Sequence, residues 1–281
     1  MNLSISNLSF RYGKHKPLVL NDVSIDFPAG GVCGMLGPNG AGKSTLLYLI
    51  SGLLNPSSGS VTFDGIPTKL RRPSILAQIY LVPEEPVLPR MSLKEYVKLY
   101  SAFYPDFNTE ILNDALKEFN MFMPDRLDSL SMGQKKKIVL SFALAATTPV
   151  LLMDEPTNGL DIPGKAAFRR LVARYASDDK LFLISTHQVR DLDQLLDRIL
   201  IMDLNKFLVN ENVYDLQQAF SFMRNIPQVP DNAITALPSL GGFDVMLPND
   251  DSDETDINLE LLFEATVNHP DKITSILNLR K

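Results

Sequence analysis

The sequence is poor in several features, and each absence narrows the fold and the cellular setting. Its 281 residues contain one cysteine, Cys33, and no tryptophan, so no disulfide can form within the chain. A single thiol is typical of proteins in reducing compartments. Acidic side chains outnumber basic ones by 33 to 27, giving a formal net charge of −6. A general nucleic-acid binder usually carries a basic surface, so no nucleic-acid partner is expected.

Long apolar runs are also missing. A membrane-spanning helix needs about 20 consecutive apolar residues, and the longest candidate, 138–153, is interrupted by Ser141, Thr147, Thr148 and Pro149. The first residues show no basic segment followed by an apolar one, so no secretory leader is expected. These absences predict a soluble, intracellular chain that reaches a membrane only through a partner.

Short apolar segments alternate with helical patterns over most of the chain. The strand-like segments are 3–10, 18–27, 32–36, 60–63, 79–82, 150–154, 181–185 and 199–202. The helical patterns are 43–54, 92–104, 108–119, 131–146, 165–175 and 191–196. Capping-box pairs open two of them, with Ser92 before Glu95 and Ser131 before Gln134. The alternation predicts an α/β fold with a mainly parallel sheet covered by helices.

The end of the chain, 206–281, has a different character. Residues 212–222 form a helical pattern, which prolines and glycines then interrupt. Residues 259–267 are predicted as a strand and 270–279 as a helix with proline at its first position. We therefore expect a small accessory α+β segment after the main domain.

A glycine-rich segment at 37–44, Gly-Pro-Asn-Gly-Ala-Gly-Lys-Ser, fits the phosphate-loop pattern G-x-x-x-x-G-K-[ST]. It follows a strand and precedes a helix, which favours this interpretation over a chance glycine-rich loop. Backbone N–H groups of such a loop wrap phosphates, Lys43 reaches the outer phosphates, and the Ser44 hydroxyl binds Mg²⁺. The residues expected to bind a nucleotide here are Asn39, Gly40, Ala41, Gly42, Lys43, Ser44 and Thr45.

Two acidic residues, Asp154 and Glu155, end the apolar run that begins at Val150. In a phosphate-loop enzyme the first acid at such a strand end holds Mg²⁺. The next side chain points elsewhere, so Glu155 is a candidate to orient or deprotonate the attacking water. Alone, the pair better fits a strand that ends in charges for solubility, but the phosphate loop favours the catalytic interpretation.

The segment 130–134, Leu-Ser-Met-Gly-Gln, resembles the LSGGQ signature of the ATP-binding cassette (ABC) ATPases, with Met132 in place of the first glycine. The resemblance implies that Ser131, Gly133 and Gln134 contact the γ-phosphate held by a second subunit. It therefore also implies a head-to-tail dimer with two ATP molecules at the interface. Without the other motifs, a capped surface helix explains this segment equally well.

Further motifs follow in the order of this family. Asp161 resembles the residue that communicates across the dimer, and His187 resembles the switch histidine that contacts the γ-phosphate. Tyr12 stands where the family places an aromatic ring on adenine; Phe10 is a weaker candidate, and an ordinary strand aromatic is the alternative. Glu84 stands where a glutamine is usual. A carboxylate still ligates Mg²⁺, but it cannot donate a hydrogen bond and it adds negative charge beside the phosphates.

The resemblance covers about 1–205 and implies the ABC-ATPase form of the P-loop NTPase fold. The parts it implies are a mainly parallel core sheet, an N-terminal antiparallel β subdomain, a helical subdomain at about 85–147, and a C-terminal extension at 206–281. Mg²⁺ is expected on Ser44, Asp154 and Glu84.

The same resemblance implies an ATP-binding and ATP-hydrolysing transporter subunit on the cytoplasmic face of the cell membrane. Its expected partners are a separate transmembrane permease, touching the surface between residues 84 and 130, and a second identical or related cassette. The segment 103–107 and Met132 are similar to bacterial exporter-type cassettes. The alternatives are a soluble ABC ATPase acting on ribosomes, DNA or cluster assembly, and a module that binds ATP without turnover. Lys43, Asp154, Glu155 and His187 are all present, which argues against a module that binds ATP without turnover.

Overall fold

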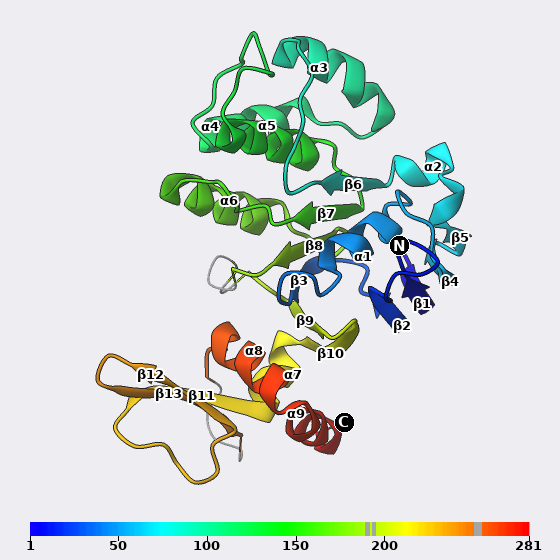
Figure 1. The fold of residues 1–281 in the computed structure, drawn as a ribbon. Coiled ribbons are helices and arrows are strands. Elements are labelled where there is room, and N and C mark those ends of the chain that lie inside the picture. The colour runs from blue at the N-terminus through cyan, green and yellow to red at the C-terminus, as the bar shows by residue number, and fades with distance from the viewer. Residues whose placement is uncertain (189–191, 193–194, 250–254, 281) are drawn as a thin grey trace.

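A six-stranded sheet forms the centre of the molecule (Figure 1). The computed structural model describes residues 1–188, 192, 195–249 and 255–280. In spatial order the strands are β10 (Lys206–Asn212), β9 (Arg198–Asp203), β3 (Gly31–Leu36), β8 (Leu181–Thr186), β7 (Val150–Asp154) and β6 (Ile79–Val82). The strands from β9 to β6 run parallel, and β10 pairs antiparallel with β9. The carboxyl ends of β3, β6, β7 and β8 therefore meet at one edge of the sheet.

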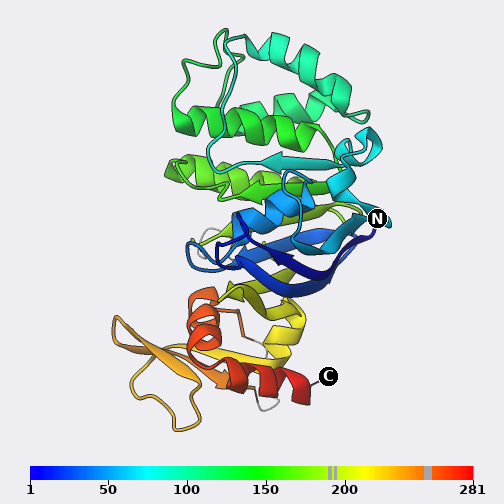
Figure 2. The same ribbon diagram turned by 45° about the vertical axis from the view of Figure 1, so that its right-hand side comes forward.

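A second, antiparallel sheet contains the start of the chain. Its order is β2 (Leu20–Phe27), β1 (Leu3–Phe10), β4 (Ser58–Phe63) and β5 (Ile66–Pro67). Buried apolar residues on one face of this sheet share a core with helix α1 (Lys43–Ile50) and with Leu152 and Leu183 of the central sheet. Helix α1 thus packs between the two sheets (Figure 2).

On the other face of the central sheet a core is shared with α5 (Met132–Ala145) and α6 (Ile162–Tyr175). Helices α3 (Leu93–Tyr100) and α4 (Thr109–Glu118) pack against α5 beyond the β6 edge of the sheet, and the short helix α2 (Pro73–Leu76) precedes β6 (Figure 1). Both predicted capping boxes are present, at Ser92 and Ser131. Phe142 of α5 and Phe168 of α6 join Leu151 of the sheet in one core. This layer fixes the position of α5, which begins at the signature segment.

The C-terminal segment packs against the edge of the central sheet. Its elements are α7 (Val213–Ala219), β11 (Phe220–Ile226), β12 (Thr235–Ser239), β13 (Gly242–Pro248), α8 (Leu259–Asn268) and α9 (Pro270–Leu279). The strands form a small antiparallel sheet in the order β11-β13-β12. Its core includes Ile199 of β9, Val209 of β10 and Leu262 of α8. Strand β10 therefore connects the segment after residue 205 directly to the central sheet.

Two predictions for this segment are wrong. Residues 259–267 form helix α8 rather than a strand, because their buried positions Leu259, Leu262 and Thr266 recur at helical spacing. The helix predicted at 212–222 ends at Ala219, because the following residues pair with β13, a partner that local pattern could not reveal. Half of the helix predicted at 191–196, namely residues 191, 193 and 194, lies outside the described residues.

Candidate functional site

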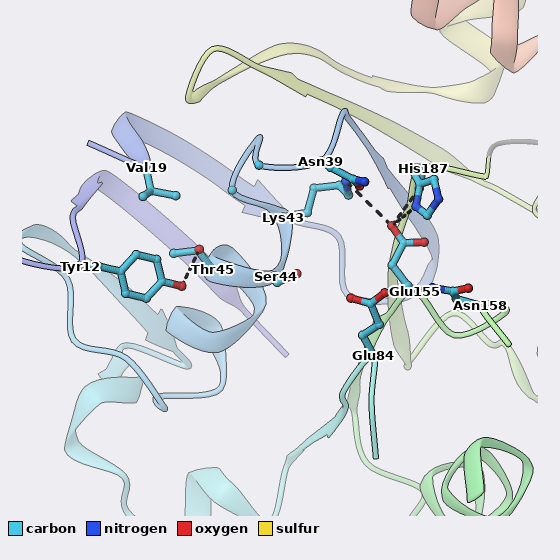
Figure 3. Close-up of a pocket in the computed structure, with 12 residues that line it drawn as sticks. Tyr12, Val19, Asn39, Lys43, Ser44, Thr45, Glu84, Glu155, Asn158 and His187 are labelled. Atoms are coloured by element: carbon cyan, nitrogen blue, oxygen red, sulfur yellow. Dashed lines mark hydrogen bonds and ion pairs between the residues drawn. The ribbon is translucent and has the colours of Figure 1, made fainter. Parts of the chain in front are cut away.

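The edge where the central strands end carries a pocket of about 630 Å³ (Figure 3). The residues that line it are Tyr12, Val19, Asn39, Gly40, Gly42, Lys43, Ser44, Thr45, Glu84, Glu155, Asn158 and His187. They come from segments far apart in the sequence, joined by the parallel order of β3, β6, β7 and β8. Most of the side chains expected to bind nucleotide therefore meet in one cavity.

The glycine-rich loop turns between β3 and α1 by means of left-handed backbone. Gly40 and Gly42 have φ values of +86° and +102°, a region that residues with a side chain seldom adopt. Gly42 is the N-cap of α1 and offers no side-chain acceptor to the first amides of the helix. Those amides and the helix dipole form a site that favours an anion such as phosphate.

Lys43 is buried beside this loop, with 6% of its surface exposed. Its ammonium donates to the carbonyl oxygens of Gly37 and Pro38, at 2.7 and 3.1 Å. Burial lowers the pKa of Lys43, and the nearby carboxylate of Glu155, at 3.9 Å, opposes that shift. The lysine therefore lies between the phosphate loop and the acidic end of β7.

The two acids at the end of β7 have different surroundings. Asp154 is buried, and its Oδ1 accepts the Ser185 hydroxyl at 2.6 Å. Glu155 adopts left-handed backbone, with φ +44°, and its side chain enters the pocket. Residues with a side chain seldom adopt this φ value, so the backbone at Glu155 is strained where its side chain enters the pocket.

Glu155 and His187 lie side by side in the pocket and contact each other (Figure 3). Oε1 of Glu155 lies 2.8 Å from Nδ1 of His187 and accepts the His187 backbone N–H at 3.0 Å, while Oε2 accepts the Thr186 hydroxyl at 3.2 Å. The carboxylate is thus held at fixed orientation beside Lys43. A carboxylate placed in this way can orient and deprotonate a water molecule.

Glu84 enters the pocket from the loop after β6. Its Oε1 accepts the amide of Asn158 at 2.9 Å. The buried Lys136 donates to the backbone carbonyl oxygen of Glu84, and also to that of Glu155 at 3.2 Å. Asn158 and Lys136 were not singled out as site residues from the sequence.

The signature residues lie outside the pocket of their own chain. Ser131 caps α5 and Gln134 completes the capping box. At Gly133 an added Cβ would lie 2.8 Å from the carbonyl oxygen of Gly159, so glycine permits this close approach. Asp161 caps α6 and its Oδ1 forms an ion pair with Lys137 at 2.9 Å.

Two further predicted residues, Ala41 and Asp154, are buried behind the pocket instead of lining it. Conversely, the lining residue Val19 had no sequence signal of its own. Ser185 and Thr186, at the end of β8, donate hydrogen bonds to Asp154 and Glu155, and neither residue has a predicted role in the site. Lys136 could have been singled out from the three successive lysines at 135–137. Successive residues of a helix point in directions about 100° apart, so three lysines in a row on a mostly apolar helix indicate that one lies close to the core.

Tyr12 lies at the end of the pocket away from the acids. It is 61% exposed, and its hydroxyl lies 3.0 Å from Oγ1 of Thr45. Phe10 packs edge-on against the Tyr12 ring, at a centroid distance of 4.9 Å, and is itself buried in the core. The geometry therefore favours Tyr12 over Phe10 as the ring available to a ligand.

If the exposed ring stacks on adenine, as the family resemblance implies for Tyr12, replacing it by alanine should raise the KM for ATP about tenfold, because stacking on a base is worth about 1–3 kcal/mol. Tyr12→Phe keeps the ring and loses only the contact with Thr45, so its KM should stay within about threefold of the wild-type value. Steady-state ATP hydrolysis by both variants measures the difference. Equal values for the two would contradict a stacking role.

The chain is similar to known proteins in sequence and in fold. The sequence profile described as ABC transporter matches residues 20–158. The ABC transporter ATP-binding protein YtrB of Bacillus subtilis (strain 168) is 29% identical over 255 residues, covering 86% of each chain. The lantibiotic transport ATP-binding protein SrtF of Streptococcus pyogenes is 30% identical over 215 residues, covering 76% of this chain and 91% of SrtF.

A solved structure of an ATP-binding subunit of an ABC transporter superimposes with a TM-score of 0.70 at 25% identity, covering 77% of this chain and 92% of that one. The likeness confirms the ABC-ATPase fold. These relatives are transporter subunits, so the comparisons support a transport ATPase and give no support to a non-transport complex. The chain belongs to the ABC transporter family, as an ATP-binding subunit that hydrolyses ATP.

Proposed function

We propose that this chain works as a head-to-tail dimer with two ATP·Mg²⁺ at its interface and drives a separate permease that exports its cargo. The dimer is supported by one observation: the signature residues lie apart from the other nucleotide-binding motifs of the same chain. The pocket gathers the phosphate loop, Glu155 and His187, whereas Ser131 and Gln134 are exposed outside it. A second cassette, identical or related, is needed to bring those signature residues to the phosphates.

In this proposal Glu155 orients and deprotonates the attacking water, and His187 contacts the γ-phosphate. Lys43 binds the β- and γ-phosphates together with the amides of the loop, and the exposed ring of Tyr12 stacks on adenine. Asp161 communicates with the opposite subunit. The contact between Glu155 and His187 supports these roles, because it holds the proposed base next to the residue proposed to contact the γ-phosphate.

Mg²⁺ is proposed to lie on Ser44, Asp154 and Glu84. The fit is chemical, because a hydroxyl and carboxylates supply the hard oxygen ligands that this ion prefers. In the described part of the chain, no group of three or more acidic, histidine or cysteine side chains could hold a metal ion. That arrangement suits an ion that also takes ligands from phosphates and water, and the bound ion would neutralise phosphate charge.

Replacing Glu84 by glutamine should raise the Mg²⁺ concentration for half-maximal hydrolysis by about 3–10-fold, because the ion loses a charged ligand. Glu85→Gln removes the same charge from the neighbouring exposed position and serves as the control. Titration of hydrolysis with Mg²⁺ at saturating ATP measures the shift. If both the rate and the Mg²⁺ dependence of Glu84→Gln match the wild type, Glu84 is not part of the metal site.

We place the chain on the cytoplasmic face of the membrane, bound to the permease through its helical layer. In the described ranges, no helix is long and apolar enough to span a membrane. Several large apolar side chains between residues 84 and 130 are exposed: Val87, Leu99, Phe103, Phe122 and Met123. Tyr96 is buried, and Met91, Tyr100, Tyr104 and Met121 pack against the core.

Export is supported by the printed name of a further relative, the Nod factor export ATP-binding protein I of Rhizobium etli, and by the sequence features at 103–107 and Met132. Affinity purification of the tagged chain from detergent-solubilised membranes tests the partner. We expect a multi-span protein in the same complex. A complex that lacks one and contains RNA or DNA would instead support the non-transport alternative.

A further inference from the structure

Lys136 is a fully buried cation outside the pocket that the proposed mechanism does not use. It lies near the start of α5, just after the signature residues, and 0% of its surface is exposed. Its neighbours differ: Lys135 is partly exposed, and Lys137 pairs with Asp161 at 2.9 Å. A lysine is seldom buried without partners, so its surroundings need an explanation.

The ammonium of Lys136 binds three backbone carbonyl groups. It donates to the carbonyl oxygens of Pro83 at 3.4 Å and Glu155 at 3.2 Å, and to that of Glu84. An ammonium has three donors, so these contacts can satisfy it. The acceptors belong to two segments, the loop after β6 and the end of β7. One side chain therefore connects both acidic segments of the pocket to α5.

The positive charge of Lys136 lies near several carboxylates. Burial lowers its pKa, and the opposing influences are the carboxylates of Glu84, Asp154, Glu155 and Glu85, with Glu84 the largest and Glu85 the smallest. Within the pocket Lys43 faces these same acids. Glu84 adds one negative charge that glutamine would not carry, and Lys136 adds one positive charge behind the pocket. The two charges are opposite in sign, and Lys136 does not line the space for nucleotide.

We propose that Lys136 is a positioning residue for ATP hydrolysis: it fastens the Glu84 loop and the Glu155 end of β7 to α5, and its charge offsets that of Glu84. This inference rests on the roles proposed above for Glu84 and Glu155. It predicts that movement of α5 is transmitted to the backbone of both acids through a single ammonium group. It also predicts that positions 84 and 136 are energetically coupled.

Two substitutions separate the charge of Lys136 from its hydrogen bonds. Lys136→Gln keeps N–H donors and removes the charge, and Lys136→Met removes both. Removing this buried positive charge leaves the repulsion between the neighbouring carboxylates and the phosphates less opposed. At saturating Mg²⁺, we therefore expect Lys136→Gln to raise the KM for ATP about tenfold. Lys136→Met should also lower kcat, and Lys135→Met, the control on the same helix, should leave both constants unchanged.

The double variant Glu84→Gln/Lys136→Gln provides the decisive comparison. If charge balance is the cause, removing both charges should return the KM for ATP to within about twofold of that of Glu84→Gln. A purely structural lysine predicts no such recovery. Melting temperatures of the full chain establish that each variant is folded, and Lys136→Gln carries the test if Lys136→Met does not fold.

Two results would overturn the proposal: Lys136→Gln kinetics equal to the wild type, or a double variant with a KM no lower than that of Lys136→Gln. Glu155→Gln, measured in the same series, distinguishes the two levels of inference. If Glu155→Gln hydrolyses ATP at the wild-type rate, the proposed catalytic site itself is wrong. If it is inactive while Lys136→Gln behaves as wild type, only the role of Lys136 fails.

Discussion

Glu155→Gln should lower kcat for ATP hydrolysis by about 100-fold or more, which is the usual loss when a positioned general base is removed. The amide cannot take a proton from water. ATP should still bind, because the substitution removes a negative charge 3.9 Å from Lys43 and leaves the phosphate loop intact. Phosphate release and equilibrium binding of a fluorescent ATP analogue measure the two effects separately.

The same variant should accumulate as an ATP-bound dimer, visible by gel filtration with light scattering, because hydrolysis no longer resets the interface. Glu110→Gln, which changes an exposed residue at the start of α4, is the matched control and should behave as wild type. If Glu155→Gln hydrolyses ATP at more than about a tenth of the wild-type rate, Glu155 is not the general base.

Lys43→Met should weaken ATP binding by about 100-fold, or about 3 kcal/mol, because hydrogen bonds to charged groups contribute most to phosphate recognition. Lys43 is the buried cation beside the phosphate loop, and methionine preserves its length and apolar stem. Isothermal titration with ATP and Mg²⁺ gives the dissociation constant. The expected loss therefore appears in binding, in contrast to the loss of turnover in Glu155→Gln.

Lys16→Met removes the same charge from the exposed turn before β2 and should bind ATP with the wild-type affinity. Circular dichroism excludes unfolding as the reason for weak binding by Lys43→Met. If Lys43→Met and Lys16→Met bind ATP equally well, the phosphates are not held at this loop.

The residues that meet in the pocket could be predicted from the sequence better than the residues around them, because each motif combines residue types that one kind of chemistry requires. The phosphate loop requires glycines at fixed spacing, and Gly40 and Gly42 indeed have left-handed backbone. The acids of β7 and His187 of the loop after β8 converge because both strands are parallel neighbours. Strand polarity follows from the alternation of strands and helices, so their proximity could be expected without a structure.

Contacts made by residues without a motif could not be predicted. Asn158 holds Glu84, and Lys136 holds the backbone of both Glu84 and Glu155. Each contact depends on how α5 and the loops pack in three dimensions. The C-terminal errors have a related cause: α8 was predicted as a strand although its apolar spacing also fitted a helix, and the partner strands β12 and β13 were not recognised.

We propose that ATP hydrolysis at this pocket drives a membrane partner. ATP hydrolysis should be measured on the complex isolated from membranes through a tagged chain, for the wild type and for Glu155→Gln in parallel. We predict that both preparations contain the same multi-span protein and that only the wild-type complex shows Mg²⁺-dependent turnover. Equal turnover in the two complexes, or no membrane protein in either, would show that hydrolysis at this pocket does not drive a membrane partner.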